Sequence, residues 1–313
     1  MSGRVAVTGG TGFIGWHICQ RLRDAGWTVT AMVRPGSRKA LPAGVDRVEA
    51  SLEANALVRA CQRADVIVHA AGIVRARTAA DYAAVNVEGT RAVIEAALAL
   101  GARLVHVSSL TAAGPAPAEQ PRREDDVSHP ITDYGASKLA AEIVLRDASS
   151  LRWTIVRPAA VYGPRDRQFL PLFQAARRGL FLRLPNAAAF SLTLVHVDDV
   201  ARASEAVCGS DAVDGETLFV GHPTPASMDE MLETLASTFG RAYRPLPVPF
   251  ALARLGAWLG VGGLSPERLH EVQSPGFVCS VERATRCLGF QAAIALPEGF
   301  RSTAAWYRST GWL

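Results

Sequence analysis

The chain has 313 residues, of which 49% are hydrophobic and 20% are charged, and its formal net charge is +4. This composition is typical of a globular enzyme with a large core, and it excludes a disordered or fibrous chain. The positive charge comes almost wholly from scattered arginines, since Lys39 and Lys138 are the only lysines, so we expect no nucleic-acid surface.

The five cysteines argue against a disulfide framework, because their number is odd and no two form a CxxC pair. They are Cys19, Cys61, Cys208, Cys279 and Cys287. The chain reaches its first predicted strand almost at once, which leaves no room for a signal peptide. We therefore expect a protein of the reducing cytoplasm.

The most apolar stretch, residues 249–264, is too short to span a bilayer, and Arg254 interrupts it. We expect no membrane span. We expect this stretch to form a helix packed in a C-terminal lobe rather than a membrane contact.

Residues 4–15 read RVAVTGGTGFIG and combine a strand pattern with a glycine-rich turn. The apolar run 4–7 is typical of a buried strand. Gly9 allows a tight turn, Gly12 lets backbone N–H groups approach a diphosphate, and Gly15 lets a helix pack close to the strand. The N-terminus of that helix attracts anions.

The surroundings of these glycines favour a dinucleotide site over an ordinary loop. Ile14, Ile18 and Leu22 have helical spacing in a helix predicted over 13–24, and a second strand is predicted over 28–33. This is the βαβ unit that the glycine motif requires.

Strands and helices continue to alternate along the chain, which predicts an α/β fold with a Rossmann-type, doubly wound parallel sheet. The predicted strands are 64–69, 103–107, 153–156 and 217–220, and the predicted helices are 85–100, 134–148 and 199–208. Long connections at the carboxyl ends of parallel strands bind ligands. We therefore expect a dinucleotide-binding domain of residues 1–164 and 194–222, and a smaller, discontinuous substrate lobe of residues 165–193 and 223–313.

Tyr134 and Lys138 are four residues apart on a predicted helix and share one face. Coulomb's law gives about 4 kcal/mol for unit charges about 4 Å apart at an effective dielectric constant of about 20, which is roughly three pKa units. We therefore expect Lys138 to lower the pKa of Tyr134 toward neutrality, where a general acid or base is most useful. An ordinary surface pair is the alternative, but a lysine in an arginine-rich chain favours chemistry, because the guanidinium fork cannot replace a compact ammonium.

Arg34 follows the second predicted strand, about twenty residues after the glycines. An acidic residue there would bind the ribose hydroxyls of NAD, whereas arginine suits the 2′-phosphate of NADP. We expect NADP as the preferred cofactor, with Arg38 and Lys39 able to help and NAD possible. A solvated basic loop is the alternative.

These motifs together resemble those of the extended short-chain dehydrogenase/reductase family, also called the NAD-dependent epimerase/dehydratase family. Besides the glycines, Ser109 and the Tyr134–Lys138 pair, the resemblance rests on HAAG at 69–72, NVEGT at 86–90, RPAAVYGP at 157–164 and HVDD at 196–199. It covers nearly the whole chain and is closest in character to the branch of dihydroflavonol reductases and 3β-hydroxysteroid dehydrogenases.

The resemblance implies a role for each residue of the catalytic set. Lys138 would hold the nicotinamide ribose, Tyr134 would exchange the proton, and Ser109 would bond the substrate oxygen. Ser108 is the alternative to Ser109, and Thr111 is a weaker third candidate.

The resemblance also implies a set of cofactor-binding residues spread over the ends of the strands. They are Gly9, Thr11, Gly12, Phe13, Ile14, Gly15, Arg34, Ser51, Leu52, Ala70, Ala71, Gly72, Asn86, Tyr134, Lys138, Pro158 and Val161. The family often has an aspartate near the adenine where this chain has Ser51 before Leu52, which puts that contact in doubt. Asn86 would lie near the nicotinamide, although an asparagine also makes local backbone bonds.

The acidic pair Asp198 and Asp199 follows His196 at the start of a predicted helix, so we expect capping and dipole roles rather than catalysis. The remaining histidines and carboxylates show no metal-ligand spacing, and we expect no metal.

We therefore expect an NAD(P)-dependent oxidoreductase that moves a hydride between the nicotinamide and a carbonyl or secondary alcohol of a small, fairly apolar substrate. Nucleotide-sugar members of the family often carry an arginine followed by an acidic residue where residues 190–194 are uncharged. The arginines at 165, 167, 177, 178 and 183 keep an anionic substrate open.

Two other functions remain as alternatives. One is a nucleotide-sugar epimerase or dehydratase with tightly bound NAD. The other is a noncatalytic NADP-binding sensor, although such relatives generally lose the tyrosine or the lysine. Family members commonly dimerise through the helices predicted at 85–100 and 134–148, so a homodimer is possible, but the same faces also suit packing on the sheet.

Overall fold

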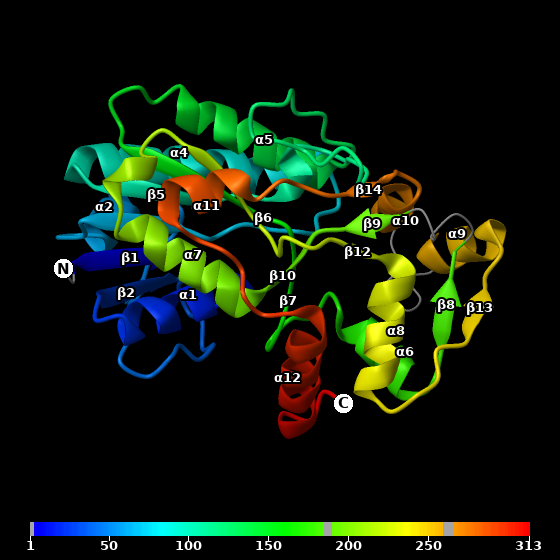
Figure 1. Cartoon of the computed structure of the whole chain (residues 1–313). Helices are drawn as coiled ribbons and strands as arrows, with labels where there is room; N and C mark the ends of the chain where they lie inside the picture. The colour runs from blue at the N-terminus through cyan, green and yellow to red at the C-terminus, as the bar shows by residue number, and fades with distance from the viewer. Residues whose placement is uncertain (1–2, 185–189, 259–265) are drawn as a thin grey trace.

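The computed structural model describes residues 3–184, 190–258 and 266–313. Among these residues, seven parallel strands form the main sheet in the order β11-β6-β5-β4-β1-β2-β3 (Figure 1). Their bounds are β1 Arg4–Thr8, β2 Thr28–Val33, β3 Asp46–Glu49, β4 Val66–His69, β5 Arg103–Val107, β6 Trp153–Pro158 and β11 Thr217–Val220. The predicted Rossmann-type fold is confirmed.

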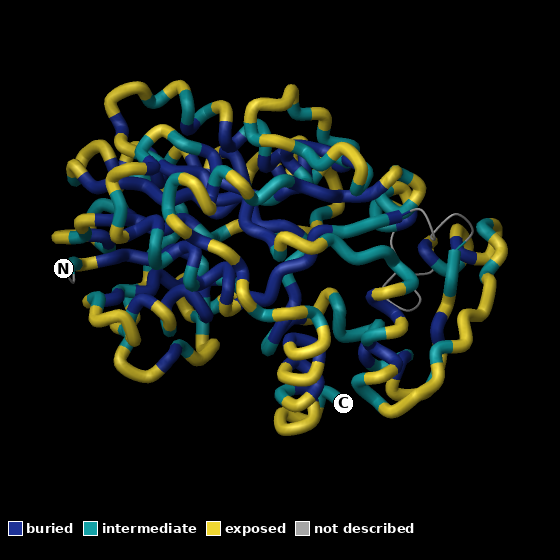
Figure 2. Tube along the Cα trace, in the orientation of Figure 1, coloured by how far each residue is buried: buried dark blue, intermediate teal, exposed yellow. Residues whose placement is uncertain are grey.

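The main sheet is covered on both faces, because successive side chains of its apolar strands point to opposite sides. Val5 and Val7 pack with α1 (Phe13–Asp24) and α7 (Val197–Cys208). Ala6 packs on the other face with α2 (Ala54–Ala60), α4 (Glu88–Leu100) and α5 (Asp133–Arg146). The sheet is therefore buried from both sides, and Figure 2 shows the buried residues concentrated there.

A second core lies in the C-terminal part, where Phe173, Phe300 and Tyr307 pack together. They come from α6 (Leu170–Arg177) and α12 (Leu296–Ser309), and α8 (Met228–Thr238) joins them. The short strands around this core are β7 Ala160–Tyr162, β8 Phe181–Arg183, β9 Ser191–Leu192, β10 Leu194–His196, β12 Ala226–Ser227, β13 Pro245–Pro247 and β14 Gly276–Phe277. They pair as β10–β7, β12–β9–β14 and β13–β8.

The remaining elements connect these layers. They are α3 Ala79–Tyr82, the π-helical turn η1 Ala83–Val87, the 3₁₀ turns η2 Leu110–Ala112 and η4 Asp211–Val213, α9 Phe250–Trp258, α10 Pro266–Val272 and α11 Glu282–Leu288. α11 returns to the main sheet, where Ala284 joins the core between the sheet, α1 and α7, which is called the large core below. In the described residues, no helix is both long and apolar enough to cross a membrane.

The predicted bounds of 13–24, 28–33, 103–107 and 217–220 match the structure. The predicted strand 64–69 begins at Val66, because the Asp65 carboxylate accepts the Arg4 N–H at 2.8 Å and Asp65 stays exposed. β3 was not predicted, because no residue of this edge strand is fully buried and it therefore lacks an apolar run. The predicted helix 85–100 is preceded by the π turn. Residues 185–189 of the predicted lobe and 259–264 of the apolar stretch lie outside the described residues.

Candidate active site

The sequence-predicted site residues gather at the carboxyl ends of the parallel strands. The glycine turn follows β1, Arg34 follows β2, Ala70–Gly72 follow β4 and Ser109 follows β5. β1 and β4 are neighbours in the sheet, and the strand order reverses between them. Such a reversal opens the crevice in which doubly wound sheets bind nucleotides.

The glycine turn brings β1, α1 and the β4 loop into close contact. Gly9 has φ +70°, and a Cβ there would lie 2.7 Å from the Ala71 nitrogen. A Cβ at Gly15 would lie 2.3 Å from the Gly9 carbonyl oxygen, so only glycine lets α1 approach the turn. A Cβ at Gly12 would meet no atom closer than that oxygen, at 3.1 Å. The side of the turn at Gly12 is therefore open.

Within the described chain, the N-cap of α1 is Gly12, so the helix has no side-chain cap, and it has no acidic residue in its first turn. α5 and α8 each begin with a side-chain cap, from Thr132 and Ser227, and each has an acidic residue in the first turn. Uncapped N–H groups and a positive helix end are suited to an anion. The α1 N-terminus thus fits the diphosphate of a dinucleotide, and the residues that would hold it are Gly9, Thr11, Gly12, Phe13, Ile14 and Gly15.

His69 ends β4 and is held as a neutral ring between two hydroxyls. Its Nδ1 lies 2.7 Å from Thr8 Oγ1, and its Nε2 lies 3.2 Å from Thr90 Oγ1. The Thr90 hydroxyl donates to the Asn86 carbonyl at 2.7 Å, so it accepts from Nε2–H, and Nδ1 accepts from Thr8. Thr8 Oγ1 also accepts the Ala71 N–H at 3.1 Å. Burial, reinforced by Lys138, lowers the pKa of His69 to about 3.

Asn86 lies in the π turn, and its amide is fully occupied by local partners. Its Oδ1 accepts the Ile73 N–H at 2.9 Å, and its Nδ2 donates to the Ile73 carbonyl at 3.1 Å and to Ser137 Oγ at 2.9 Å. These bonds join the loop after β4 to α5. Asn86 therefore positions the loop that carries Ala70, Ala71 and Gly72.

Ser109 and Tyr134 meet across the start of α5. The Ser109 hydroxyl accepts from Thr111 Oγ1 at 2.8 Å and from the Thr111 N–H at 3.2 Å, and it forms a side-chain hydrogen bond with Tyr134. Gly135 makes this contact possible, since a Cβ there would lie 2.5 Å from the Thr111 carbonyl oxygen. The geometry thus distinguishes the two serines, because Ser108 points elsewhere.

Ser108 belongs to a buried charged network behind the site. Its hydroxyl donates to Glu142 at 2.5 Å. Arg157 donates to both oxygens of the same carboxylate, at 2.9 and 2.6 Å, and Arg146 adds a bond at 3.0 Å. Glu142 and Arg157 are almost completely buried, and loss of either one would leave the charge of the other buried without a partner. This network fixes the end of β5 against α5.

Lys138 lies buried one turn after Tyr134, with its ammonium directed at the end of β5. Nζ donates to the Val107 carbonyl at 2.8 Å and lies 3.5 Å from His106 Nε2. Burial lowers the pKa of Lys138 to about 8, although the Glu142 carboxylate opposes this shift. The other nitrogen of His106, Nδ1, is buried and has no hydrogen-bond partner among the described residues.

The expectation that Lys138 lowers the pKa of Tyr134 toward neutrality is wrong for the free protein. Burial raises the pKa of Tyr134 to about 12, and the hydrogen bond from Ser109 opposes the rise only in part. The physical reason is that desolvation of the phenolate outweighs the stabilising contacts, while the Lys138 ammonium is bonded to Val107. Tyr134 therefore keeps its proton at neutral pH.

Sequence reasoning missed the charged helix α10, which comes from the C-terminal part of the chain. The charge of Glu271 acts on Tyr134, and that of Glu267 acts on Tyr82, whose ring centre lies 6.1 Å from that of Tyr134. Burial raises the pKa of Glu271 to about 7. No motif in the sequence marks this short helix, so only the fold reveals it.

The predicted adenosine end is more exposed. Arg34, Arg38 and Lys39 are all exposed on the loop after β2, and Arg47 fixes that loop through the carbonyls of Ser37 and Lys39. Ser51 and Leu52 follow β3 and are partly buried. Leu52 packs against α4, where a Cβ at Gly89 would lie 3.1 Å from it.

The remaining predicted residues have structural partners. Pro158 pairs with Val220 in the main sheet, and Val161 pairs with Val195. His196 caps α7 by accepting the Asp198 N–H at 3.2 Å, and Asp199 accepts two backbone N–H groups from Ala293 and Ile294. The side-chain cap of α7 is therefore His196, and Asp198 and Asp199 lie in the first turn, which agrees with the predicted dipole role. Within the described ranges, no cluster of three or more His, Cys, Asp or Glu residues could hold a metal ion.

Comparison with known proteins gives matches over most of the chain. The model of the NAD dependent epimerase/dehydratase family matches residues 5–221. A ceramide reductase of Caulobacter vibrioides is 32% identical over 99% of this chain and 96% of its own length. A UDP-glucose 4-epimerase of Azospirillum brasilense is 31% identical over 98% of this chain and 93% of its own length. The solved structure of MoeE5 with UDP-glucuronic acid and NAD has a TM-score of 0.80 and 26% identity, covering 98% of this chain and 100% of that one.

Proposed function

The chain belongs to the NAD-dependent epimerase/dehydratase family and is an NAD(P)-dependent oxidoreductase of the extended short-chain type, and from this premise we propose that it reduces a ketone on an apolar, long-chain substrate. Tyr134, Lys138 and Ser109 are the proposed catalytic residues, and NADPH is the proposed preferred cofactor. The bound cofactor would supply the hydride.

The observation that carries this proposal is the protonated Tyr134 beside Ser109. Ketone reduction adds a proton to the carbonyl oxygen, and a phenol with a pKa of about 12 holds such a proton at neutral pH. The Ser109 hydroxyl, which already accepts two bonds from Thr111, keeps its own hydrogen on the side of Tyr134 to orient that oxygen. The Lys138 ammonium would donate hydrogen bonds to the ribose hydroxyls and so hold the nicotinamide end of the cofactor.

The apolar substrate is supported by the segment before β10. Phe190 is buried in the large core, and Ser191 and Leu192 pair with β12 and β14. Thr193 accepts the Cys279 N–H at 3.2 Å. No cation stands at residues 190–194 to bind a sugar nucleotide's diphosphate. The relative named for ceramide, a lipid with long hydrocarbon chains, points the same way.

The NADPH preference rests on the exposed cations Arg34, Arg38 and Lys39 after β2. A 2′-phosphate carries charge that such a loop can pair. The structural relative holds NAD, so NAD remains the alternative cofactor.

The remaining proposals concern organisation. We propose residues 1–164 and 194–222 as the dinucleotide-binding domain and residues 165–193 and 223–313 as the substrate lobe. Leu98 of α4 and Ile143 of α5 are exposed hydrophobic residues on neighbouring helices, which supports a homodimer through them. The five cysteines are all described and all free, which supports a reducing cytoplasm.

The test is turnover of purified protein with NADPH and a series of 3-oxo esters of increasing chain length, beside UDP-glucose with NAD. We expect NADPH to be consumed with the ketones and kcat/KM to rise with chain length. Conversion of UDP-glucose without ketone reduction would contradict the proposal and favour the epimerase alternative, which the relative from Azospirillum represents.

A further inference from the structure

We propose that the outer edge of the C-terminal part docks on an anionic lipid bilayer. This surface, the lobe edge, consists of residues 177–184 and 241–258, which hold β8, β13 and α9 and lie at the end of the molecule away from the N-terminus (Figure 1). The inference goes beyond the proposed chemistry, because it concerns where the protein meets an apolar substrate.

The orientation of α9 is the first observation. The helix buries its small residues Ala253 and Ala257 and partly buries Phe250 at its start, but it leaves its other large apolar residues outside. Leu252, Leu255 and Trp258 are 60%, 52% and 78% exposed. A helix that merely covered the lobe would bury its large side chains, since burial of each gives about 1.5–3 kcal/mol. The predicted packed helix therefore exists, but its large apolar face points outward.

The neighbouring strands extend the same apolar surface. Of the ten large hydrophobic side chains exposed in the described part of the chain, six lie on the lobe edge. Leu182 of β8 and Leu246 of β13 sit opposite each other in the strand pair, and Leu180 precedes them. Exposed apolar side chains that cluster on one surface indicate an interaction surface, whereas single exposed apolar side chains scattered over a protein are ordinary.

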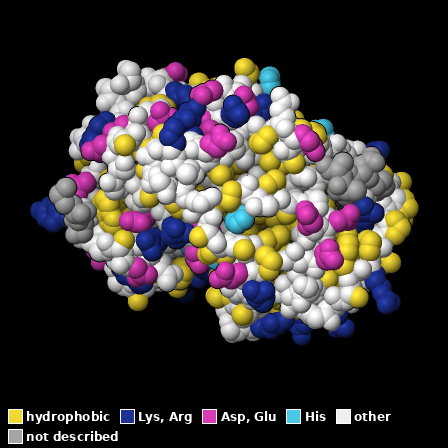
Figure 3. Space-filling view, viewed as in Figure 1, with side chains coloured by type: hydrophobic (Ala, Val, Ile, Leu, Met, Phe, Trp, Pro, Cys, Tyr) yellow, Lys and Arg dark blue, Asp and Glu magenta, His cyan; other side chains and the backbone are white. Residues whose placement is uncertain are grey.

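The charge of the lobe edge indicates which partner covers it. Its two segments, both described in full, contain six arginines and no acidic residue, namely Arg177, Arg178, Arg183, Arg241, Arg244 and Arg254. Arg183 pairs with Asp229 of α8 at 2.8 Å, and the other five are exposed. Figure 3 shows hydrophobic and cationic side chains at this end, with acidic side chains of neighbouring segments beside them. Large apolar residues flanked by arginine suit the interface of an anionic membrane.

A groove opens at the lobe edge. It measures about 850 Å³ and lies between α9 and α10, lined by Phe250, Leu255, Trp258 and Leu269 among others. α10 also carries Glu271, whose charge acts on Tyr134. α10 therefore borders the groove at the lobe edge and also carries a charge that acts on the proposed catalytic tyrosine.

The test is cosedimentation of the full chain with vesicles, in the absence of substrate. Vesicles of phosphatidylcholine alone are compared with vesicles that also contain phosphatidylglycerol. We expect binding to the anionic vesicles that added salt weakens. The triple variant Leu252→Ser, Leu255→Ser, Trp258→Ser should bind at least about tenfold more weakly.

Matched controls keep the result specific. The double variant Leu98→Ser, Ile143→Ser removes exposed apolar side chains from α4 and α5 and should bind like the wild type. Arg254→Glu should weaken binding, whereas Arg59→Glu on the exposed face of α2 should not. Turnover of a short, water-soluble ketone should stay unchanged in the triple variant, which shows that it is folded.

Absence of wild-type binding to anionic vesicles would overturn the proposal, as would equal loss in the α4–α5 control. A change of molar mass by light scattering in the triple variant, without vesicle binding by the wild type, would assign the surface to a second copy of this chain instead. The ketone assay in solution tests the proposed function separately, so the two failures are distinguishable.

Discussion

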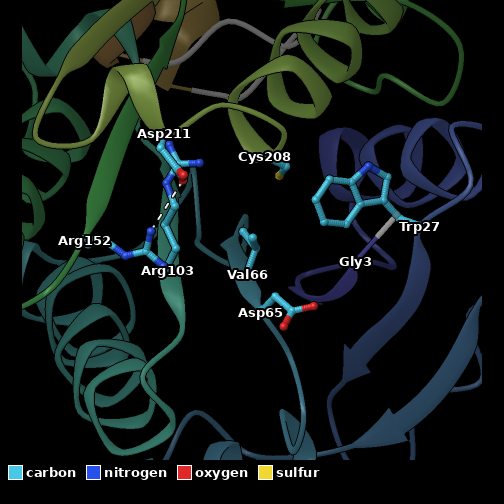
Figure 4. Close-up of a pocket in the computed structure, with 8 residues that line it drawn as sticks. All are labelled: Gly3, Trp27, Asp65, Val66, Arg103, Arg152, Cys208 and Asp211. Carbon is cyan, nitrogen blue, oxygen red and sulfur yellow. Dashed lines mark hydrogen bonds and ion pairs between the residues drawn. The ribbon is translucent and has the colours of Figure 1, made fainter. Parts of the chain in front are cut away.

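The amino-terminal ends of the main-sheet strands form one side of the sheet, called here the amino edge, and their carboxyl-terminal ends form the other, the carboxyl edge. Both edges bury polar groups, but the partners of these groups differ. At the amino edge, a cavity of about 290 Å³ is lined by Arg103, Arg152 and Asp211 among others (Figure 4). Arg103 is buried and pairs with Asp214, while it donates to the Val207 carbonyl at 2.7 Å and to Thr154 at 2.9 Å. The cations and acids at this edge form ion pairs with one another, Arg103 with Asp214 and Arg152 with Asp211.

At the carboxyl edge, the buried polar groups are matched only in part. The α1 N-terminus lacks a side-chain cap, His106 keeps an unpartnered nitrogen within the described residues, and Lys138 shares its ammonium with a backbone carbonyl. Unmatched groups of this kind are suited to a ligand, whereas a closed ion-pair network stabilises the fold. A cavity alone therefore does not mark the site; the state of its polar groups does.

Removal of Arg103 should give the largest effect and should act on stability alone. Arg103→Met removes the buried partner of the Asp214 carboxylate, which among the described residues keeps only Arg152 at 3.9 Å, and we expect the free energy of unfolding to fall by about 3–5 kcal/mol. Urea denaturation measures this loss. The exposed neighbour gives the control, because Arg152→Met should cost less than about 1 kcal/mol. If kcat of the folded Arg103 variant also fell a hundredfold, this would contradict the assignment of the amino edge to stability and of the carboxyl edge to activity.

Tyr134→Phe should show the reverse pattern. It removes the proton donor and keeps the ring, so we expect kcat to fall at least about a hundredfold, or about 2.7 kcal/mol, with little change in stability or cofactor affinity. Stopped-flow turnover and fluorescence titration with NADPH measure the two quantities. Tyr82→Phe, which alters the neighbouring ring 6.1 Å away, should retain most activity. Near wild-type turnover by the Tyr134→Phe variant would refute the assigned role.

Acid should destabilise the carboxyl edge through its buried histidines. The pKa of His69 is about 3 in the folded protein and that of His106 is also lowered, so between about pH 6.5 and 3 the unfolded chain binds protons that the folded chain does not. Stability is therefore lost as the pH falls, by about 1.4 kcal/mol per pH unit for each histidine.

The variant His69→Gln tests this prediction more closely, because it removes one of the two histidines that bind a proton only in the unfolded chain. Between pH 6.5 and 5 the pH-dependent loss should shrink by about 2 kcal/mol, whatever the variant's absolute stability. The matched change His129→Gln alters an exposed residue and should leave the slope as it was. Equal slopes in the wild type and His69→Gln would show that His69 does not stay neutral.

The contrast also explains how much the sequence could predict. The βαβ unit was readable because β1 and β2 are buried runs and glycines must stand where a Cβ would clash, as at Gly15. Its bounds follow from periodicity alone. The edge strand β3 was not predicted because it is only partly buried, and a strand without an apolar run lacks the hydrophobic pattern by which strands are recognised.

The site was predictable to the same extent. The spacing of Tyr134 and Lys138 placed both on α5, but spacing carries no information on desolvation, so the direction of the Tyr134 pKa shift was missed. Glu271 reaches the site from α10 across the chain, and no local pattern could reveal that approach. The outward large face of α9 was likewise hidden, since a sequence shows that a helix is apolar but not which side is covered.

Exchange of the charge at Arg34 should give the smallest effect, because this residue is exposed at the rim of the carboxyl edge. Solvent and salt weaken an exposed pair, so we expect Arg34→Asp to raise the Kd for NADPH by about tenfold and to lower that for NADH, as the new carboxylate accepts from the ribose hydroxyls. Fluorescence titration at low and high salt measures both. Arg63→Asp, on an exposed turn after α2, is the matched control and should change neither. A wild type that already prefers NADH would remove the phosphate role of Arg34 while leaving the proposed roles of Tyr134 and Lys138 intact, because those residues are proposed to act at the nicotinamide end of the cofactor, away from the phosphate.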